Sequence, residues 1–92
     1  MDDREAIDAV RRGDQVAFAA LVTRYQDQLY TFALRLSGSP PDAADAVQET
    51  FTRAYLHVRE LRADTLRAWL FRVTTNCVRD QQRKRMGCPA AS

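Results

Sequence analysis

The chain has 92 residues, with 14 lysines and arginines against 12 aspartates and glutamates, so its net charge is +2. This length fits one domain, and a 46% hydrophobic share argues for a packed fold over a disordered one. No segment approaches the ~18 uncharged apolar residues of a membrane helix, and the acidic N-terminus lacks the apolar core of a signal peptide. Two cysteines and one histidine cannot complete a usual zinc set or a disulfide scaffold. We expect a soluble, cytoplasmic, all-helical domain without metal or cofactor.

The first two predicted helices lie N-terminal to Ser37-Gly38. Residues 2–12 indicate a short helix that Gly13 ends, and Asp14 can cap the next helix. In that next helix, apolar residues recur at steps of three and four, on one face: Phe18, Leu21, Val22, Tyr25, Leu29, Phe32, Ala33 and Leu36. Tyr30 and Leu34 lie off this face, which predicts a second contact, with the first helix.

Two further helices are predicted in the second half of the chain. Ser39 followed by two prolines is a start signal for a helix that buries Val47, Phe51, Ala54, Tyr55 and Val58. After a break at Leu61–Thr65, where Asp64 or Thr65 can cap, a last helix runs to about Arg85 and buries Leu66, Trp69, Leu70, Val73 and Cys77. The sequence therefore predicts an all-α fold, a compact bundle of about four helices over residues 1–85. Residues 86–92 are expected to form a linker or disordered tail.

Charge is concentrated at the C-terminal end. Residues 1–66 carry 8 basic and 11 acidic side chains, whereas residues 67–92 carry 6 basic side chains and 1 acidic side chain. At 100° per residue, one face of the last helix gathers Arg72, Thr75, Asn76, Arg79 and Arg83. Guanidinium groups suit phosphate and a carboxamide can bond a base, so the face indicates nucleic-acid binding. By charge alone, a solvated helix end is an equal alternative.

Two other features have alternatives that periodicity leaves open. Phe71 lies off the core face and can stack on an unpaired base, but packing under a neighbouring helix is the favoured interpretation for this residue alone. The third helix carries a hydrophilic face that is either solvated or a protein-binding surface: Asp45, Gln48, Glu49 and Thr52.

Three stretches resemble bacterial sigma factors. Residues 41–55, PDAADAVQETFTRAY, resemble the second conserved region of these proteins. Residues 66–76, LRAWLFRVTTN, are similar to the Leu-Arg-Thr-Trp-Leu-Tyr-Arg-Ile-Ala-x-Asn pattern of the extracytoplasmic-function (ECF) group. Residues 18–36 resemble that group's first conserved stretch, with its Leu-Tyr at Leu29-Tyr30. The resemblance covers roughly residues 5–85 and implies a sigma region 2 domain, which binds the RNA polymerase core and recognises and melts the −10 promoter element.

The resemblance also implies roles for particular residues. It implies that four residues bind the clamp coiled coil of the polymerase β′ subunit: Asp45, Gln48, Glu49 and Arg53. The loop receives a base flipped from the non-template single strand of the −10 element: Leu61, Arg62, Ala63, Asp64 and Thr65. The last helix supplies further DNA contacts through Phe71, Arg72, Thr75, Asn76, Arg79 and Arg83. No covalent chemistry is required, and no glycine-rich phosphate loop or Ser/His/Asp set is evident, so an enzyme is the least expected class.

Two departures from the family pattern bear on the expected function. Where the family usually has an aromatic residue and Arg-Gly, this chain has Leu61-Arg62-Ala63, in a loop one residue shorter than the commonest form. This difference should reshape the base pocket. The family also carries a second helical domain, region 4, for the −35 element. Nothing after Ser92 forms it, so we expect an isolated first domain or a truncated chain, whose promoter binding alone should be weak.

Two alternatives remain at this point. The chain can act mainly as the partner of an anti-sigma factor, without autonomous promoter binding. A redox switch through Cys77 and Cys88 is a third possibility, although the core-face position of Cys77 favours a small buried hydrophobe.

Overall fold

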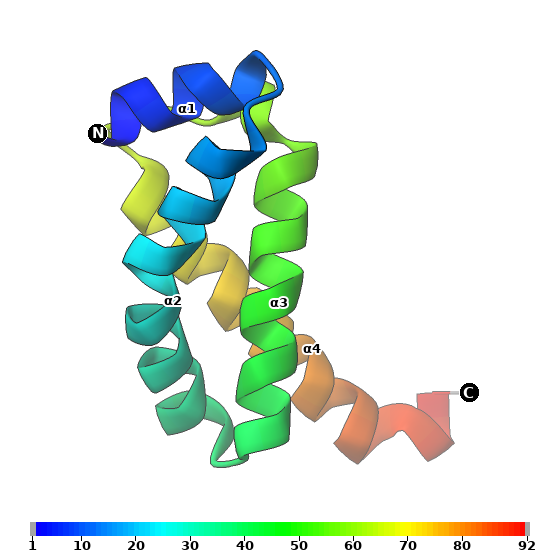
Figure 1. Cartoon of the computed structure of the whole chain (residues 1–92). Coiled ribbons are helices and arrows are strands. Elements are labelled where there is room, and N and C mark those ends of the chain that lie inside the picture. The colour runs from blue at the N-terminus through cyan, green and yellow to red at the C-terminus, as the bar shows by residue number, and fades with distance from the viewer. Residues whose placement is uncertain (1, 92) are drawn as a thin grey trace.

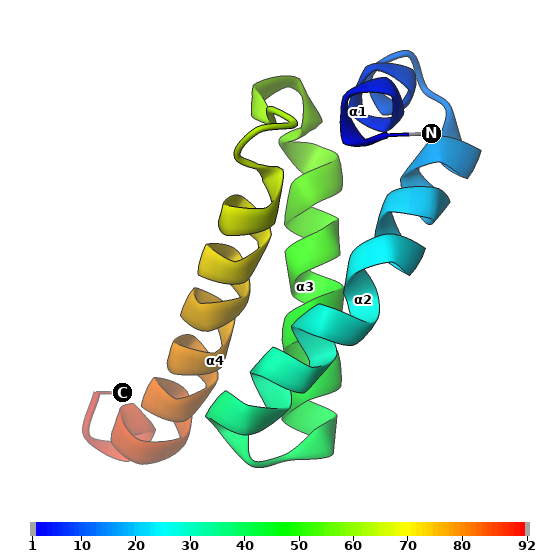
Figure 2. The same ribbon diagram turned by 90° about the vertical axis from the view of Figure 1, so that its left-hand side faces the viewer.

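The computed structural model describes the backbone of residues 2–91 and the side chains of residues 2–85. Within these residues, α2 and α3 form an antiparallel hairpin, α4 packs behind both, and α1 lies across one end (Figures 1 and 2). The helices are α1 (Asp3–Arg11), α2 (Gln15–Ser37), α3 (Pro40–Leu56) and α4 (Leu66–Ala91), with a 3-10 turn η1 (Val58–Glu60) between α3 and α4. The prediction of an all-α bundle of about four helices is confirmed.

Short polar side chains begin the first three helices. The Asp2 carboxylate accepts from the Glu5 amide at 2.9 Å, and the predicted cap Asp14 accepts from the Ala17 amide at 3.1 Å. The predicted cap Ser39 accepts from the Asp42 amide at 3.5 Å. Each side chain satisfies an amide that the first turn leaves without a helical partner. At the end of α2, Gly38 has a φ of 70°, a left-handed conformation that glycine adopts without a steric penalty.

The buried residues form two clusters along the bundle. The cluster at the α1 end contains the largest side chains, among them Leu29, Leu66 and Leu70. The cluster at the far end is built from small residues: Ala33, Ala43, Ala46, Val73, Cys77 and Val78. Because alanines carry little bulk, they allow the helix backbones to approach closely. Trp69 and Val47 pack against both clusters and join them.

Several side chains are placed differently from the prediction. Tyr30 and Leu34 pack against the far cluster, not against α1, because the nine-residue α1 covers only the beginning of α2. Tyr55 and Leu36, which were predicted to be buried, are 45% and 41% exposed. Trp69, predicted within the core, is half-buried. These residues lie at the edges of the apolar stripes, where a neighbour on only one side covers part of the ring or chain.

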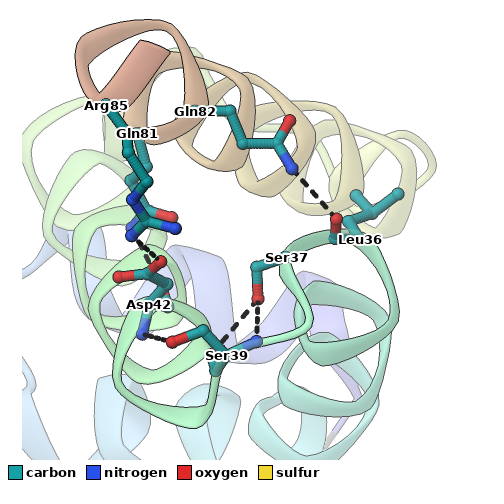
Figure 3. Close-up of polar contacts among 7 residues, drawn as sticks. All are labelled: Leu36, Ser37, Ser39, Asp42, Gln81, Gln82 and Arg85. Atoms are coloured by element: carbon teal, nitrogen blue, oxygen red, sulfur yellow. Dashed lines mark hydrogen bonds and ion pairs between the residues drawn. The ribbon is translucent and has the colours of Figure 1, made fainter.

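The far end of α4 is tied to the turn between α2 and α3 (Figure 3). Arg85 forms an ion pair with Asp42, and the Gln81 amide donates to the Asp42 backbone carbonyl at 3.0 Å. Gln82 donates to the Leu36 carbonyl at 3.1 Å. The backbone of α4 continues to Ala91, beyond the predicted end near Arg85. The side chains of residues 86–91 and all of Ser92 lie outside the described residues, so the linker or tail over residues 86–92 stays a prediction.

A buried pair of hydroxyls joins α3 to α4. Thr50 and Thr74 are fully buried, with their Oγ1 atoms 2.7 Å apart, and each Oγ1 also lies within 2.9 Å of the carbonyl oxygen one turn earlier in its own helix. Because each hydroxyl has one proton, one threonine donates to the other, and the second donates to its own helix carbonyl. Replacing either threonine with valine is expected to lower the free energy of unfolding by about 1 kcal/mol, because the remaining hydroxyl loses a partner away from water. In a double-mutant cycle measured by urea unfolding, the double valine variant should lose clearly less free energy of unfolding than the two single variants lose together. Strictly additive losses would show that the two hydroxyls do not interact.

Candidate functional site

The hydrophilic face predicted on the third helix is present on α3. Asp45, Gln48 and Glu49 are exposed, and Arg53 is half-buried. The Arg53 Nε donates to the Glu49 carboxylate at 2.9 Å, and this bond raises the pKa of Arg53 above its usual value. An exposed pair one turn apart contributes little to stability, so both groups remain available to a partner.

An apolar groove runs beside this face, between α2 and α3. Its volume is about 1000 Å³, and Gln48 and Thr52 form part of its α3 wall. The apolar lining consists of Phe18, Ala19, Val22, Tyr30, Ala44, Val47, Phe51, Tyr55 and Leu56. Its residues come from α2 and α3 alone, whereas α4 crosses behind these helices in Figure 1. The apolar pattern did not predict this groove. The signal in the sequence is Leu56, an apolar residue that follows Tyr55 off the buried stripe. In the structure Leu56 is 72% exposed.

The residues of the predicted loop differ in how far they are exposed to solvent. Leu61 is 4% exposed and packs in the core, so this residue offers only its backbone to a ligand. Arg62, Asp64 and Thr65 are exposed, and the Arg62 guanidinium lies 3.4 Å from the Asp64 carboxylate. Ala63 is half-buried. A cavity of about 250 Å³ separates the loop from α1, lined by Arg4, Ile7, Asp8, Arg11, Leu61, Arg62, Ala63 and Asp64.

The basic face predicted on the last helix lies on the surface of α4. Arg72, Asn76, Arg79 and Arg83 are exposed, and Arg83 lies 3.3 Å from Asp80. Thr75 is half-buried, with its hydroxyl donating to the Phe71 carbonyl at 2.9 Å. The loop leads directly into α4, the helix that carries this face.

Phe71 packs under a neighbouring helix. Its ring meets Phe32 of α2 edge to face with 5.0 Å between centroids, and the Arg67 guanidinium lies 4.9 Å over the same ring. The packing alternative for this residue is therefore confirmed.

Cys77 is a buried thiol, as its position on the core face predicted. It is 6% exposed, and burial raises its pKa above the usual value, which disfavours the reactive thiolate. Cys88, the other cysteine of the redox alternative, lies outside the residues whose side chains are described.

Two negative observations apply to the described part of the chain. None of its helices has the length and apolarity that a bilayer crossing requires. Its side chains also form no cluster of three or more histidines, cysteines or carboxylates able to hold a metal ion.

Comparisons with known proteins assign the chain to a family. Residues 21–87 match the Sigma-70 region 2 family. The chain is 42% identical over 76 residues to the ECF RNA polymerase sigma factor SigE of Mycolicibacterium smegmatis, covering 79% of this chain and 30% of that protein. It is 36% identical over 83 residues to SigW of Bacillus subtilis, covering 89% and 44%, respectively. The chain thus spans less than half the length of these relatives.

A solved structure agrees with the sequence comparisons. An engineered region 2 of sigmaE, determined by NMR in complex with GTAAAA, superposes with a TM-score of 0.80 and 31% identity, covering 94% of both chains. The match includes the helical order seen here, and the ECF resemblance noted in the sequence is confirmed by the relatives. Since the family match extends over most of the chain and its relatives are ECF sigma factors, the chain belongs to the sigma-70 region 2 family.

Proposed function

We propose that the chain binds the RNA polymerase core through α3 and the single-stranded −10 promoter element through the loop and α4, in transcription initiation. The observation that carries the proposal is the match over 94% of both chains to a region 2 domain solved with GTAAAA. Residues 1–85 act as the binding unit. The protein works by binding alone, in the cytoplasm, where the polymerase is.

The α3 surface has the composition of a docking site for a helical partner. Apolar grooves accept a helix through side chains repeated at three and four residues, and a polar rim sets orientation. Here the groove between α2 and α3 supplies the apolar floor, and Gln48 lies in its wall. Asp45 and Glu49 add carboxylates beside it, which favour a partner that displays cations. The clamp coiled coil of the β′ subunit is the partner that the family resemblance implies.

The loop and α4 contact different parts of the DNA: α4 mainly the phosphate backbone and the loop the flipped base. Arg72, Arg79 and Arg83 are exposed along α4 and offer guanidinium groups suited to phosphate, while Asn76 offers a carboxamide among them. Unstacking one base costs a few kcal/mol, which contacts to that base and to the backbone must offset. We assign the flipped base to the loop, through the exposed Arg62, Asp64 and Thr65 and the backbone of Leu61 and Ala63.

Changing Gln48 and Glu49 together to alanine should weaken binding to polymerase core by about tenfold or more. The expectation treats both residues as hot spots near the centre of the interface, where truncation to alanine costs about 2 kcal/mol or more. The melting temperature should stay nearly unchanged because both side chains are exposed. The measurement is core binding by fluorescence anisotropy alongside circular dichroism.

The matched control is Thr31→Ala with Arg35→Ala, a pair of exposed α2 residues outside the groove. This control should bind core as the wild type does. If the Gln48 and Glu49 variant unfolds, these residues are structural and the assignment of the α3 face is wrong.

The apolar groove also supports a second function, that of an interaction module held by an anti-sigma factor. Leu56, which is 72% exposed, lines this groove beside Tyr55, and a contiguous exposed apolar surface favours a protein partner irrespective of DNA. A chain that binds core but no −10 single strand in the polymerase complex would favour this alternative. Binding of both ligands would favour the sigma function.

A further inference from the structure

Arg11 of α1 holds the backbone that leads into the loop. Its guanidinium donates to the carbonyls of Val58 at 3.2 Å and Arg59 at 3.4 Å, and also to the carbonyl of Leu61. These partners lie 47 to 50 residues away along the chain. One planar side chain therefore fixes three points of the path from η1 to the loop.

The loop's own backbone bonds are few. The Leu61 amide bonds the Val58 carbonyl at 3.3 Å, and the Thr65 amide bonds the Arg62 carbonyl at 3.2 Å. On the inner side, Leu61 is buried in the core, while the outer side chains of Arg62 and Asp64 are exposed. Across residues 58–61, Arg11 thus adds three side-chain bonds to the two backbone bonds of this stretch, those of the Glu60 amide to the His57 carbonyl at 2.9 Å and of the Leu61 amide to the Val58 carbonyl.

α1 is a firm support for this contact. Ala6, Ile7, Ala9 and Val10 bury one side of the helix. Asp3 accepts from Arg24 and from the Tyr25 hydroxyl on α2, and burial together with the Asp3 bond raises the pKa of Tyr25 to about 12. Asp8 lies 3.5 Å from Arg11 and orients the guanidinium from its own helix. The cavity of about 250 Å³ opens between this arrangement and Arg62–Asp64.

We propose that Arg11 is a positioning residue for base recognition: by holding the carbonyls of residues 58, 59 and 61, it sets the loop in the conformation that selects a base. This inference rests on the proposed function, in which the loop receives the flipped base. α1 precedes the residues 21–87 matched by the family, so the role belongs to a part of the chain outside that match. Arg11 acts through the loop backbone and not through contact with DNA.

The test compares Arg11→Ala and Arg11→Lys with the matched control Arg12→Ala, which removes the same charge from the next, exposed residue. The first readout is amide hydrogen exchange without DNA. Arg11→Ala should speed exchange of the Leu61 and Thr65 amides by about tenfold or more, the effect of losing a bond to a charged group, with the buried part of α4 unchanged. Arg11→Lys should restore part of the protection, because an ammonium still donates but cannot span three carbonyls as a planar fork.

The second readout is binding of single-stranded GTAAAA and its single-base variants, followed by NMR titration so that weak binding is measured. The ratio between the best and worst oligonucleotides should fall by about threefold or more in Arg11→Ala, a loss that a purely electrostatic role would not produce. Arg12→Ala should keep the wild-type ranking.

Three results would overturn the inference or its basis, and they differ from one another. Unchanged exchange together with an unchanged ranking in Arg11→Ala would show that Arg11 does not position the loop. An equal loss of affinity for every oligonucleotide, matched by Arg12→Ala, would reduce Arg11 to a general positive charge. If the wild type itself ranks no oligonucleotide above another, the proposed role of the loop fails, whatever Arg11 does to the exchange rates.

Discussion

Leu70→Ala is expected to lower the free energy of unfolding by about 2–5 kcal/mol, a large part of what a domain of this size commonly has. Leu70 is 1% exposed in the cluster at the α1 end and lies among Leu29, Leu66 and other large side chains. Removing its side chain loses the burial of those methyl groups and leaves a cavity that closely packed neighbours fill only in part. Urea unfolding monitored by circular dichroism measures the loss.

The control for this change is Leu56→Ala, the same chemical truncation at a leucine that is 72% exposed. Its free energy of unfolding should stay within about 0.5 kcal/mol of the wild type. Comparable losses of unfolding free energy at Leu70 and Leu56 would mean that the stability of the protein does not depend on the burial of Leu70.

Arg79→Ala should weaken binding to all −10 single strands alike and reduce the salt slope by about one. The reason is that Arg79 is exposed on α4, and in the proposed function its guanidinium meets phosphate, whose charge is the same at every base. Asn76→Ala, and changes of Arg62 or Asp64, should instead alter the ranking of oligonucleotides, by roughly 1–3 kcal/mol where a paired base contact is lost. Binding of oligonucleotide variants at several salt concentrations, with core polymerase present to raise affinity, separates the two effects.

Arg35→Ala is the matched control for Arg79, since it removes an equal charge from an exposed position on α2. It should leave the salt slope nearly as it is in the wild type. The opposite pattern, with Arg79→Ala changing the ranking and the loop substitutions leaving it untouched, would reverse the assignment of helix to backbone and loop to base.

The elements of this protein were determined by local sequence. Asp14 and Ser39 begin their helices as predicted, and α2 ends just before Gly38, where the pattern placed its end. The break before Leu66 is also present, but α3 ends earlier than predicted, at Leu56, so Val58 lies in η1. Capping depends on residues within one turn, and the apolar stripe of a helix follows from its period, so neighbours in sequence suffice for both. The exposed face of Arg72, Asn76 and Arg79 follows from the same period.

Contacts across the bundle were decided only by the tertiary structure. Tyr30 belongs to the far cluster because α1 is too short to reach it. Tyr55 lines the groove and packs edge to face against Phe18, with 5.2 Å between ring centroids. Leu61 is buried although it begins a loop. The bonds from Arg11 to the backbone near the loop join residues almost fifty positions apart. Such contacts depend on how whole helices are placed against one another, which no period of three or four residues records.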